Sequence, residues 1–297
     1  MKVGIDLGGS HIAVGLIESS GKVLSKKEVQ ILKEDEKNIK DIIEDYIVGS
    51  TEEFKRLGDI ESIGIAIPGT VSTTTVVKSV NLGLENYNIV EALSQKINVP
   101  IKIKNDAKCA AIAENTYGSI KEYKNAIFLT LGTGIGGAAI YDNKLLSPVE
   151  VPGFEFGHMI IKHNGKLCRC GKRGCFEQYG SMYAFKEKII NELELNPKIE
   201  GEKLLKELKQ EKENPAIIGI IDEYLTDLSV GISNLINIFE PQAISIGGSF
   251  VYFSDLLLPG LKEKLLNDNL LFNQREDLVL NVATLGNDAG MIGASLI

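Results

Sequence analysis

Long apolar runs and an excess of positive charge are both missing from this 297-residue chain. Its longest apolar run, residues 216–221, is far shorter than the ~18 residues that a membrane helix needs. Residues 1–5 pass directly into a strand-like pattern without the apolar core of a signal peptide, and no Asn-x-Ser/Thr sequon occurs. A net charge of −8 disfavours nonspecific binding to nucleic acid or to an anionic membrane. We therefore expect a cytoplasmic protein without a membrane or nucleic-acid partner.

Cysteine is also scarce, and three of the four cysteines lie within eight residues of one another. Cys168, Cys170 and Cys175 follow His158, so three thiolates and one imidazole can complete a tetrahedral shell for Zn²⁺. The alternative is one disulfide and a spare thiol, with His158 an ordinary histidine. Cys-x-Cys is a poor disulfide spacing, and a reducing compartment favours metal over disulfides. A closed shell has no open position for water, so we predict a structural zinc that fixes its loop.

A glycine turn with an acid before it follows the first predicted strand, residues 2–7. Asp6 lies near the end of this strand, and Gly8, Gly9 and Ser10 form the turn. Glycines lack a Cβ, so their backbone amides can approach an anion closely, and Asp6 can hold Mg²⁺ directly or through water. Taken alone, these residues favour an ordinary Gly-Gly hairpin with a surface acid.

A second glycine turn, residues 132–137, follows a predicted buried strand at 125–131 and contains Thr133 and Gly134. It spells G-x-G-x-x-G, but a dinucleotide site requires a helix after the glycines. The residues that follow, 138–142, have the pattern of a strand, so we reject a Rossmann site.

The segment 125–146 repeats the pattern of segment 2–24, which is strand, glycine turn, strand, turn, strand. Such a repeat indicates two similar α/β lobes, and two glycine turns favour phosphate binding more than one turn does. The G-x-x-x-x-G-K-[ST] motif is absent, which excludes a P-loop NTPase. The length of the chain and its 44% hydrophobic residues also agree with two packed lobes.

Polar or glycine residues follow three further predicted strands. Asn105 and Asp106 end the strand at 101–104, just before a helix expected from 107 to about 118. α/β proteins place their chemistry at such strand ends, although both residue types also cap helices. Gly69 follows the strand at 60–67, and the segment 70–88 after it has no regular pattern and is long enough to line a cleft. Gly247 and Gly248 follow the strand at 243–246, where the residues alone show only a strand-to-helix turn.

The block Glu155-Phe156-Gly157-His158, followed by Cys-x-Cys-Gly-x-x-Gly-Cys-x-Glu, resembles the signature of the ROK family of bacterial sugar kinases and repressors. Within that family it is most similar to the ATP-dependent glucokinases. The other motifs occur in the family's order along the whole chain. The resemblance implies a two-lobed, duplicated α/β fold of the actin-like sugar-kinase ATPase type (ribonuclease H-like) with a cleft between the lobes. It places residues 1–117 and 288–297 in the small lobe and residues 118–287 in the large lobe.

The resemblance also implies an activity, namely transfer of the ATP γ-phosphoryl group to the 6-hydroxyl of a hexose such as glucose, in carbohydrate metabolism (glycolysis). Its cofactors would be ATP with Mg²⁺ and a structural Zn²⁺, and homodimers are usual in the family. Asp106 matches the catalytic aspartate that acts as the general base. The implied sugar-binding residues are Gly69, Asn105, Asp106, Glu155, His158 and Glu177. The implied ATP-binding residues are Asp6, Gly8, Gly9, Ser10, Thr133, Gly134, Gly247 and Gly248, and the implied zinc ligands are His158, Cys168, Cys170 and Cys175.

Two positions depart from the family pattern. Phe154 stands where the family commonly has glycine, and Ser10-His11 stands where it commonly has Thr-Lys. Three alternatives to a glucokinase remain at this stage: a kinase for N-acetylmannosamine, mannose, allose or fructose, a sugar-sensing protein without turnover, and a repressor. The repressor is disfavoured because we expect the first strand to start at residue 2 and because the chain is acidic.

Overall fold

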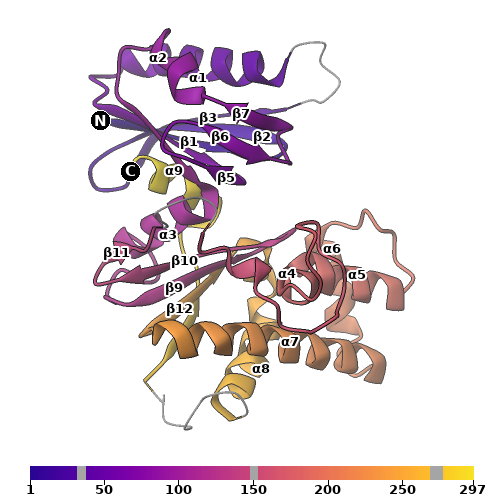
Figure 1. The fold of residues 1–297 in the computed structure, drawn as a ribbon. Helices are drawn as coiled ribbons and strands as arrows, with labels where there is room; N and C mark the ends of the chain where they lie inside the picture. Colours follow the sequence, from indigo (N-terminus) through magenta and orange to yellow (C-terminus); the bar gives the residue numbers. More distant parts are fainter. Residues whose placement is uncertain (32–37, 148–152, 268–276) are drawn as a thin grey trace. The chain divides into compact units, whose positions relative to one another are not determined.

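The computed structural model describes residues 1–31, 38–147, 153–267 and 277–297 (Figure 1). The chain forms two compact units. The first consists of Met1–Lys121, Leu145–Gly153 and Leu285–Ile297, and the second of Glu122–Lys144 and Phe154–Thr284. Within the described residues, no helix has the length and apolarity needed to cross a membrane.

A five-stranded mixed sheet in the order β3-β2-β1-β4-β8 forms the centre of the first unit. Its strands are β1 (Lys2–Leu7), β2 (His11–Ile17), β3 (Val23–Gln30), β4 (Ser62–Ile67) and β8 (Ile101–Asn105). β1 pairs antiparallel with β2 and parallel with β4, and β4 pairs parallel with β8. This order brings the ends of β1, β4 and β8 to the same edge of the sheet.

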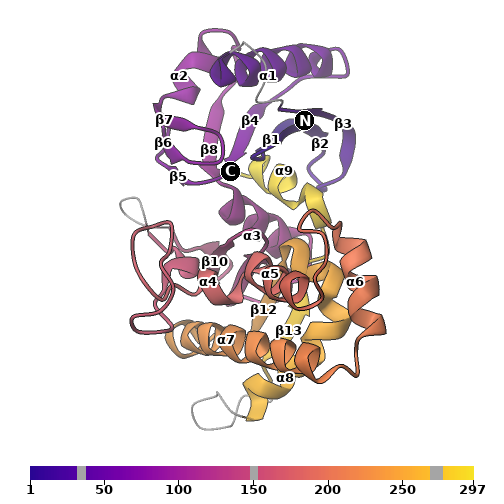
Figure 2. The same ribbon diagram turned by 90° about the vertical axis from the view of Figure 1, so that its right-hand side faces the viewer.

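The two faces of β1 have different partners. Val3, Ile5 and Leu7 are fully buried in the hydrophobic core of the unit, which also includes residues of α1 (Ile39–Lys55) and α2 (Ile89–Ser94). On the other face, α9 (Ala289–Ala294) contacts β1 and β4, as both views show (Figures 1 and 2). A Cβ at Gly4 would overlap the carbonyl oxygen of Met291, so only glycine allows α9 to pack this closely. Asp6 shares this second face because side chains alternate along a strand.

The second unit repeats the architecture of the first, with a sheet in the order β11-β10-β9-β12-β13. Its strands are β9 (Ala126–Leu131), β10 (Ile135–Tyr141), β11 (Lys144–Leu145), β12 (Ala243–Gly247) and β13 (Val279–Val282). β9 pairs antiparallel with β10 and parallel with β12, and β12 pairs parallel with β13. The strand order, and the directions of β10, β9, β12 and β13, match those of the first sheet, which confirms the predicted duplication of an α/β lobe.

The helices of the second unit follow its glycine turn and the segment that contains Cys168, Cys170 and Cys175. They are α4 (Glu177–Gly180), α5 (Met182–Glu192), α6 (Gly201–Gln210), α7 (Pro215–Phe239) and α8 (Ser254–Asn267), with 3₁₀ turns η1 (Phe156–His158) and η2 (Gly248–Phe253). In the first unit, α3 (Asp106–Thr116) follows β8, and η3 (Gly286–Asp288) leads into α9.

The segment 70–88, for which the sequence predicts irregular structure, contains a small antiparallel sheet. Its strands are β5 (Thr70–Val71), β6 (Val76–Ser79) and β7 (Leu84–Tyr87), and Val76, Leu84 and Tyr87 enter the core of the first unit. Strands of two to four residues are too short to show a period-two pattern, which explains the missed prediction.

Strand β10 starts at Ile135 rather than at residue 138, because Gly136 and Gly137 pair with Thr130 and Leu129 instead of forming a wider turn. The strand that follows the glycines still rules out a Rossmann motif, as predicted.

Candidate functional site

The four predicted zinc ligands lie together in the second unit. The ligand atoms of His158, Cys168, Cys170 and Cys175 are all within 4.8 Å of one another. The distance from Cys168 Sγ to His158 Nδ1 is 3.7 Å, and that from Cys170 Sγ to Cys175 Sγ is 3.6 Å. A tetrahedral Zn²⁺ with ordinary Zn–S and Zn–N bonds separates its ligand atoms by about 3.5–3.8 Å. These residues therefore fit a closed zinc shell, and all three thiols are free rather than paired in a disulfide.

Tight backbone turns bring the cysteines together. Between Cys168 and Lys172 the chain turns back on itself, with the Cys168 N–H donating to the Lys172 carbonyl (2.8 Å) and the Gly171 N–H to that of Cys168 (2.9 Å). Gly171 and Gly174 have φ of +88° and +82°, which favour glycine. A Cβ at Gly174 would also overlap the carbonyl oxygen of Lys162. We call the segment from Ile160 to Cys175 the metal hairpin, because isolated bridges join Ile160 with Cys175 and Leu167 with Arg173.

The protonation of the thiols depends on a nearby positive charge. Burial raises the pKa of the Cys175 thiol to about 12 and also raises the pKa of Cys168. Thiols with raised pKa values become thiolate ligands only when a cation offsets the cost of burying their charge. Despite the opposing effect of burial, hydrogen bonds from the backbone of Lys172 and from the other two thiols lower the pKa of the exposed Cys170. The cluster is therefore suited to a bound metal ion, with Cys170 the thiol that ionises most easily.

The predicted sugar-binding residues of this unit are adjacent to the metal cluster. His158 ends the 3₁₀ turn η1, and its N–H donates to the Glu155 carbonyl (3.0 Å). The contact between His158 Nδ1 and Cys168 leaves Nε2 as the other ring nitrogen available to a ligand. The carboxylate of Glu155 is exposed. The preceding residue, Phe154, has φ +56°, in the left-handed region that favours glycine. The departure at this position therefore keeps the backbone conformation of a glycine.

Glu177 connects the metal hairpin with the second glycine turn. Its Oε2 accepts a hydrogen bond from the Ile135 N–H (3.2 Å), and its Oε1 lies 3.9 Å from Cys168 Sγ. A Cβ at Gly134 would overlap this carboxylate. One side chain at the start of α4 therefore contacts both a predicted metal ligand and the turn predicted to hold phosphate.

The four nucleotide-binding residues predicted in this unit lie at the ends of two neighbouring parallel strands. Thr133 is exposed in the turn after β9, and Gly247 pairs with Thr130 across the β9–β12 ladder. Gly248 has φ +73°, and a Cβ there would lie 2.6 Å from the Leu131 carbonyl oxygen. The structure therefore brings the glycines at 247 and 248 next to the turn that contains Thr133 and Gly134.

In the first unit, Asp6 and Asp106 lie close to each other. Burial, followed by the negative charge of Asp106, raises the pKa of Asp6 from 3.8 to about 7. Gly290 packs directly against Asp6, because a Cβ there would lie 2.5 Å from the Asp6 Oδ2. Two neighbouring carboxylates repel each other unless a proton or a cation lies between them. Their oxygen atoms are the type of ligand that Mg²⁺ prefers.

Gly8, Gly9 and Ser10 form a tight turn after β1, in which the Gly8 N–H donates to the His11 carbonyl (2.9 Å). The imidazole of His11 covers Gly8, since a Cβ at Gly8 would lie 2.6 Å from the ring carbon Cε1. Ser10 is exposed. The second departure from the family pattern therefore places an imidazole over the first glycine turn.

Asn105 both caps α3 and joins two strand ends. Its Oδ1 accepts from the Lys108 N–H (3.2 Å), so the capping alternative is correct for this residue. Its Nδ2 donates to the Gly69 carbonyl (3.1 Å), which ties the end of β8 to the end of β4. Asp106, the first residue of α3, accepts from the Ala107 N–H (2.8 Å). Capping thus fixes the direction of α3 and the position of Asp106 at its start.

Two supporting residues were not identified from the sequence. The buried Lys108 donates to the Gly153 carbonyl (3.0 Å), directly before the segment that contains Glu155. Glu114 is fully buried and accepts from the backbone N–H groups of Ser119 and Leu285 (2.7 and 2.8 Å). A lysine and a glutamate inside a helix usually face solvent, so only their burial shows these roles.

Comparison with known proteins covers the chain from end to end. The ROK family profile matches residues 2–297. The glucokinase of Streptomyces coelicolor is 29% identical over 312 residues, which cover 99% of this chain and 96% of that protein. The xylose repressor of Caldicellulosiruptor bescii is 28% identical over 304 residues, which cover 98% of this chain and 76% of the repressor.

Among solved structures, the ROK family glucokinase of Streptomyces griseus in complex with glucose and AMPPNP superposes with a TM-score of 0.82. Its sequence is 27% identical, and the match covers 99% of this chain and 97% of the glucokinase. The fold is therefore the two-lobed sugar-kinase fold that the motifs imply. The profile match over almost the whole chain shows that the protein belongs to the ROK family.

Proposed function

We propose that the protein is an ATP-dependent hexose kinase that transfers the γ-phosphoryl group of ATP to the 6-hydroxyl of glucose. The observation that carries this proposal is the pair of neighbouring carboxylates, Asp6 and Asp106, at the ends of two strands of one sheet. Phosphoryl transfer needs positioning and charge neutralisation, and such a pair offers a metal ligand and a general base. The full-length similarity to glucokinases supports the same reaction.

In this proposal, Asp106 accepts the proton of the attacking hydroxyl, and Asp6 holds Mg²⁺ directly or through water. When bound, Mg²⁺ neutralises the charge on the phosphate oxygens. Gly8 closes the turn through its bond to the His11 carbonyl, the Gly9 amide approaches the phosphates closely because Gly9 has no Cβ, and Ser10 adds a hydroxyl. Asn105 holds a sugar hydroxyl, and its bond to the Gly69 carbonyl fixes the amide's orientation.

The second unit supplies the remaining contacts in the proposal. Glu155, Glu177 and His158 bind ring hydroxyls, and His158 does so through Nε2 while Nδ1 binds the structural zinc. Thr133 and Gly134 contact the phosphates, and the glycines at 247 and 248 contact the adenosine. We further propose functional lobes of residues 1–117 with 288–297 and residues 118–287, a cytoplasmic location and a homodimer.

Substitution of Asp106 by Asn tests the assignment of the base. General-base catalysis contributes about 10²–10⁴-fold to the rate, so we expect kcat to fall by that factor. Glucose affinity, measured by calorimetry, should be retained because an amide still binds hydroxyls. A variant with at least half of the wild-type kcat in a coupled ADP-release assay would show that Asp106 is not the base.

The identity of the hexose is tested with a panel of glucose, mannose, allose, fructose and N-acetylmannosamine in the presence of Mg-ATP. We expect the highest kcat/KM with glucose. The similarity to xylose repressors raises a second candidate, a sugar sensor without turnover. Sugar binding by calorimetry without any ADP release across the panel would favour the sensor and contradict the kinase.

A further inference from the structure

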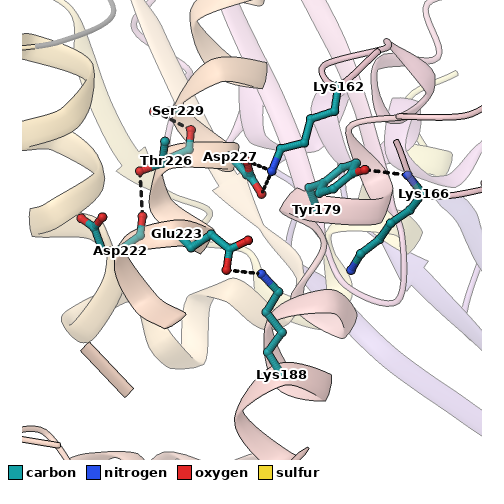
Figure 3. A network of polar contacts seen from close by, with 9 residues as sticks. All are labelled: Lys162, Lys166, Tyr179, Lys188, Asp222, Glu223, Thr226, Asp227 and Ser229. Carbon is teal, nitrogen blue, oxygen red and sulfur yellow. Dashed lines mark hydrogen bonds and ion pairs between the residues drawn. The ribbon is translucent and has the colours of Figure 1, made fainter. Parts of the chain in front are cut away.

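An ion pair outside the predicted site joins the metal hairpin to helix α7 (Figure 3). Lys162 Nζ lies 2.8 Å from Asp227 Oδ1 and 3.0 Å from Asp227 Oδ2, so both carboxylate oxygens contact one ammonium group. Asp227 is 5% exposed, whereas most acidic residues of α7 and its neighbours point to solvent. Acidic side chains are rarely buried unless they are paired. The function proposed above assigns no role to either residue.

The backbone of Lys162 pairs directly with the residue before a metal ligand. The Ile161 and Lys162 N–H groups both donate to the Gly174 carbonyl, at 2.9 and 3.3 Å. Gly174 also packs so tightly on Lys162 that a Cβ would overlap the Lys162 carbonyl oxygen. Cys175 follows Gly174, and its bridge with Ile160 continues the same pairing. The position of Cys175 therefore depends on the position of Lys162.

Tyr179 holds the other arm of the metal hairpin. Its hydroxyl accepts from the Lys166 N–H (2.7 Å), two residues before the ligand Cys168. The Lys162 ammonium lies 4.6 Å from the centre of the same ring, and the Lys166 ammonium lies 5.6 Å from it. In Figure 3, dashed lines join Lys162 with Asp227 and Tyr179 with Lys166, and the ring of Tyr179 lies beside Lys162. Both arms of the hairpin are thereby attached to helices α4 and α7.

We propose that Asp227 and Lys162 are positioning residues of the metal centre. Their ion pair holds the metal hairpin on α7, keeps Cys175 in the geometry of the zinc shell and slows the loss of the metal. Exposed ion pairs contribute little on average. This pair differs because its carboxylate is buried, so removal of Lys162 leaves a buried charge without its counterpart, and removal of Asp227 detaches the hairpin from α7. The consequence for sugar binding at His158 rests on the proposed function, whereas the consequence for the metal does not.

The test compares variants on the same helix. Asp227→Asn and Lys162→Met each remove the ion pair, and Lys162→Arg keeps a positive charge. Glu223→Gln is the matched control, because Glu223 lies one turn earlier on α7 and pairs at 2.8 Å with Lys188 of α5 rather than with the metal hairpin. Zinc content is measured by elemental analysis, and the rate of zinc release is followed with a colorimetric chelator in excess.

We expect Asp227→Asn and Lys162→Met to release zinc about tenfold faster than the wild type, at the lower end of the effect of residues that orient metal ligands. Lys162→Arg should be close to wild type, and Glu223→Gln should remain within about twofold. In the kinase assay, the two disruptive variants should raise the KM for the sugar and leave kcat nearly unchanged. If either residue had only a general role in folding, its substitution would lower the melting temperature but would not raise KM while kcat stays unchanged.

The proposal is wrong if folded Asp227→Asn or Lys162→Met protein releases zinc at the wild-type rate, or if Glu223→Gln accelerates release equally. It is also wrong if elemental analysis finds no zinc in the purified wild type. If Asp227→Asn does not fold, Lys162→Met and Lys162→Arg decide the question alone. A protein that fails to phosphorylate any hexose would contradict the proposed function, while the zinc-release rates would still test the positioning role.

Discussion

Asp6 is expected to lower the stability of the fold at neutral pH, and its replacement by Asn should therefore raise it. Burial and the charge of Asp106 raise the pKa of Asp6 from 3.8 to about 7. The unfolded chain ionises this carboxyl at a lower pH than the folded chain does. The ionised form thus favours the unfolded state, and the free energy of unfolding falls as the pH rises from about 4 to about 7.

The size of the effect follows from the shift. One pKa unit corresponds to 1.36 kcal/mol, so a shift from 3.8 to about 7 costs on the order of 4 kcal/mol above pH 7. At pH 5 the same relation gives a cost of roughly 1.5 kcal/mol. Asn has nearly the same shape and no charge, so Asp6→Asn should be more stable than the wild type. Its advantage should grow by about 2–3 kcal/mol between pH 5 and pH 8.

The assay is urea unfolding followed by circular dichroism at both pH values, with no Mg²⁺ or ATP present. Asp59→Asn is the control, because it makes the same substitution at an exposed aspartate outside the site. The same Asp6→Asn protein should lose kinase activity, as expected for a residue whose burial serves function at the expense of stability. An advantage that is equal at pH 5 and pH 8 would refute the reasoning about the buried carboxylate.

The remaining predictions concern the second unit. Cys170→Ser should remove one ligand of the predicted zinc shell. Elemental analysis should then find little zinc, and calorimetry should find a lower melting temperature. A full zinc content in this variant would contradict the predicted shell. Gly134→Ala should push the Glu177 carboxylate away from the Ile135 N–H, because the added Cβ would overlap it. Since small misplacements in an active site can reduce the rate about 10²-fold, we expect kcat/KM for ATP to fall at least tenfold. An unchanged kcat/KM would mean that the contact between the turn and Glu177 is not needed.

Several features of the fold were predictable because their signals are local. Helix α7, for example, spans Pro215–Phe239, and residues beside both of its ends mark these bounds. Its start is marked by the Asn214 cap and Pro215 in the first turn, and its end by Glu240 in the left-handed conformation. The duplication of the lobe was predictable because the sequence shows the same pattern twice, an apolar strand followed by a glycine turn and a second strand. The short strands β5 to β7 could not be predicted from the sequence, because their conformation depends on their pairing with one another.

The residues of the candidate site could be predicted from the sequence, but the side chains that they contact in space could not. The predicted zinc ligands lie close together in the sequence, and the structure brings them within 4.8 Å of one another. Asp6 and Asp106 are a hundred residues apart, and their proximity depends on the strand order that places β4 between β1 and β8. The pairing of Lys162 with Asp227 crosses 65 residues and joins a loop to a long helix. Contacts of this kind are set by tertiary packing and leave no periodic signal in the sequence.

The contacts of Glu177 indicate what a structural metal, if bound by the predicted ligands, would do at this position. The carboxylate lies beside the metal ligand Cys168 and also accepts from the Ile135 N–H at the end of the second glycine turn. The Gly132 carbonyl of that turn accepts from Tyr183 at the start of α5 (3.1 Å), so the turn has a second anchor that does not depend on the metal. A metal that fixes Cys168 therefore limits the freedom of Glu177 while leaving the main support of the turn intact. We infer that the metal serves chiefly to orient acidic and imidazole side chains toward a ligand, and that the glycine turn would survive its loss.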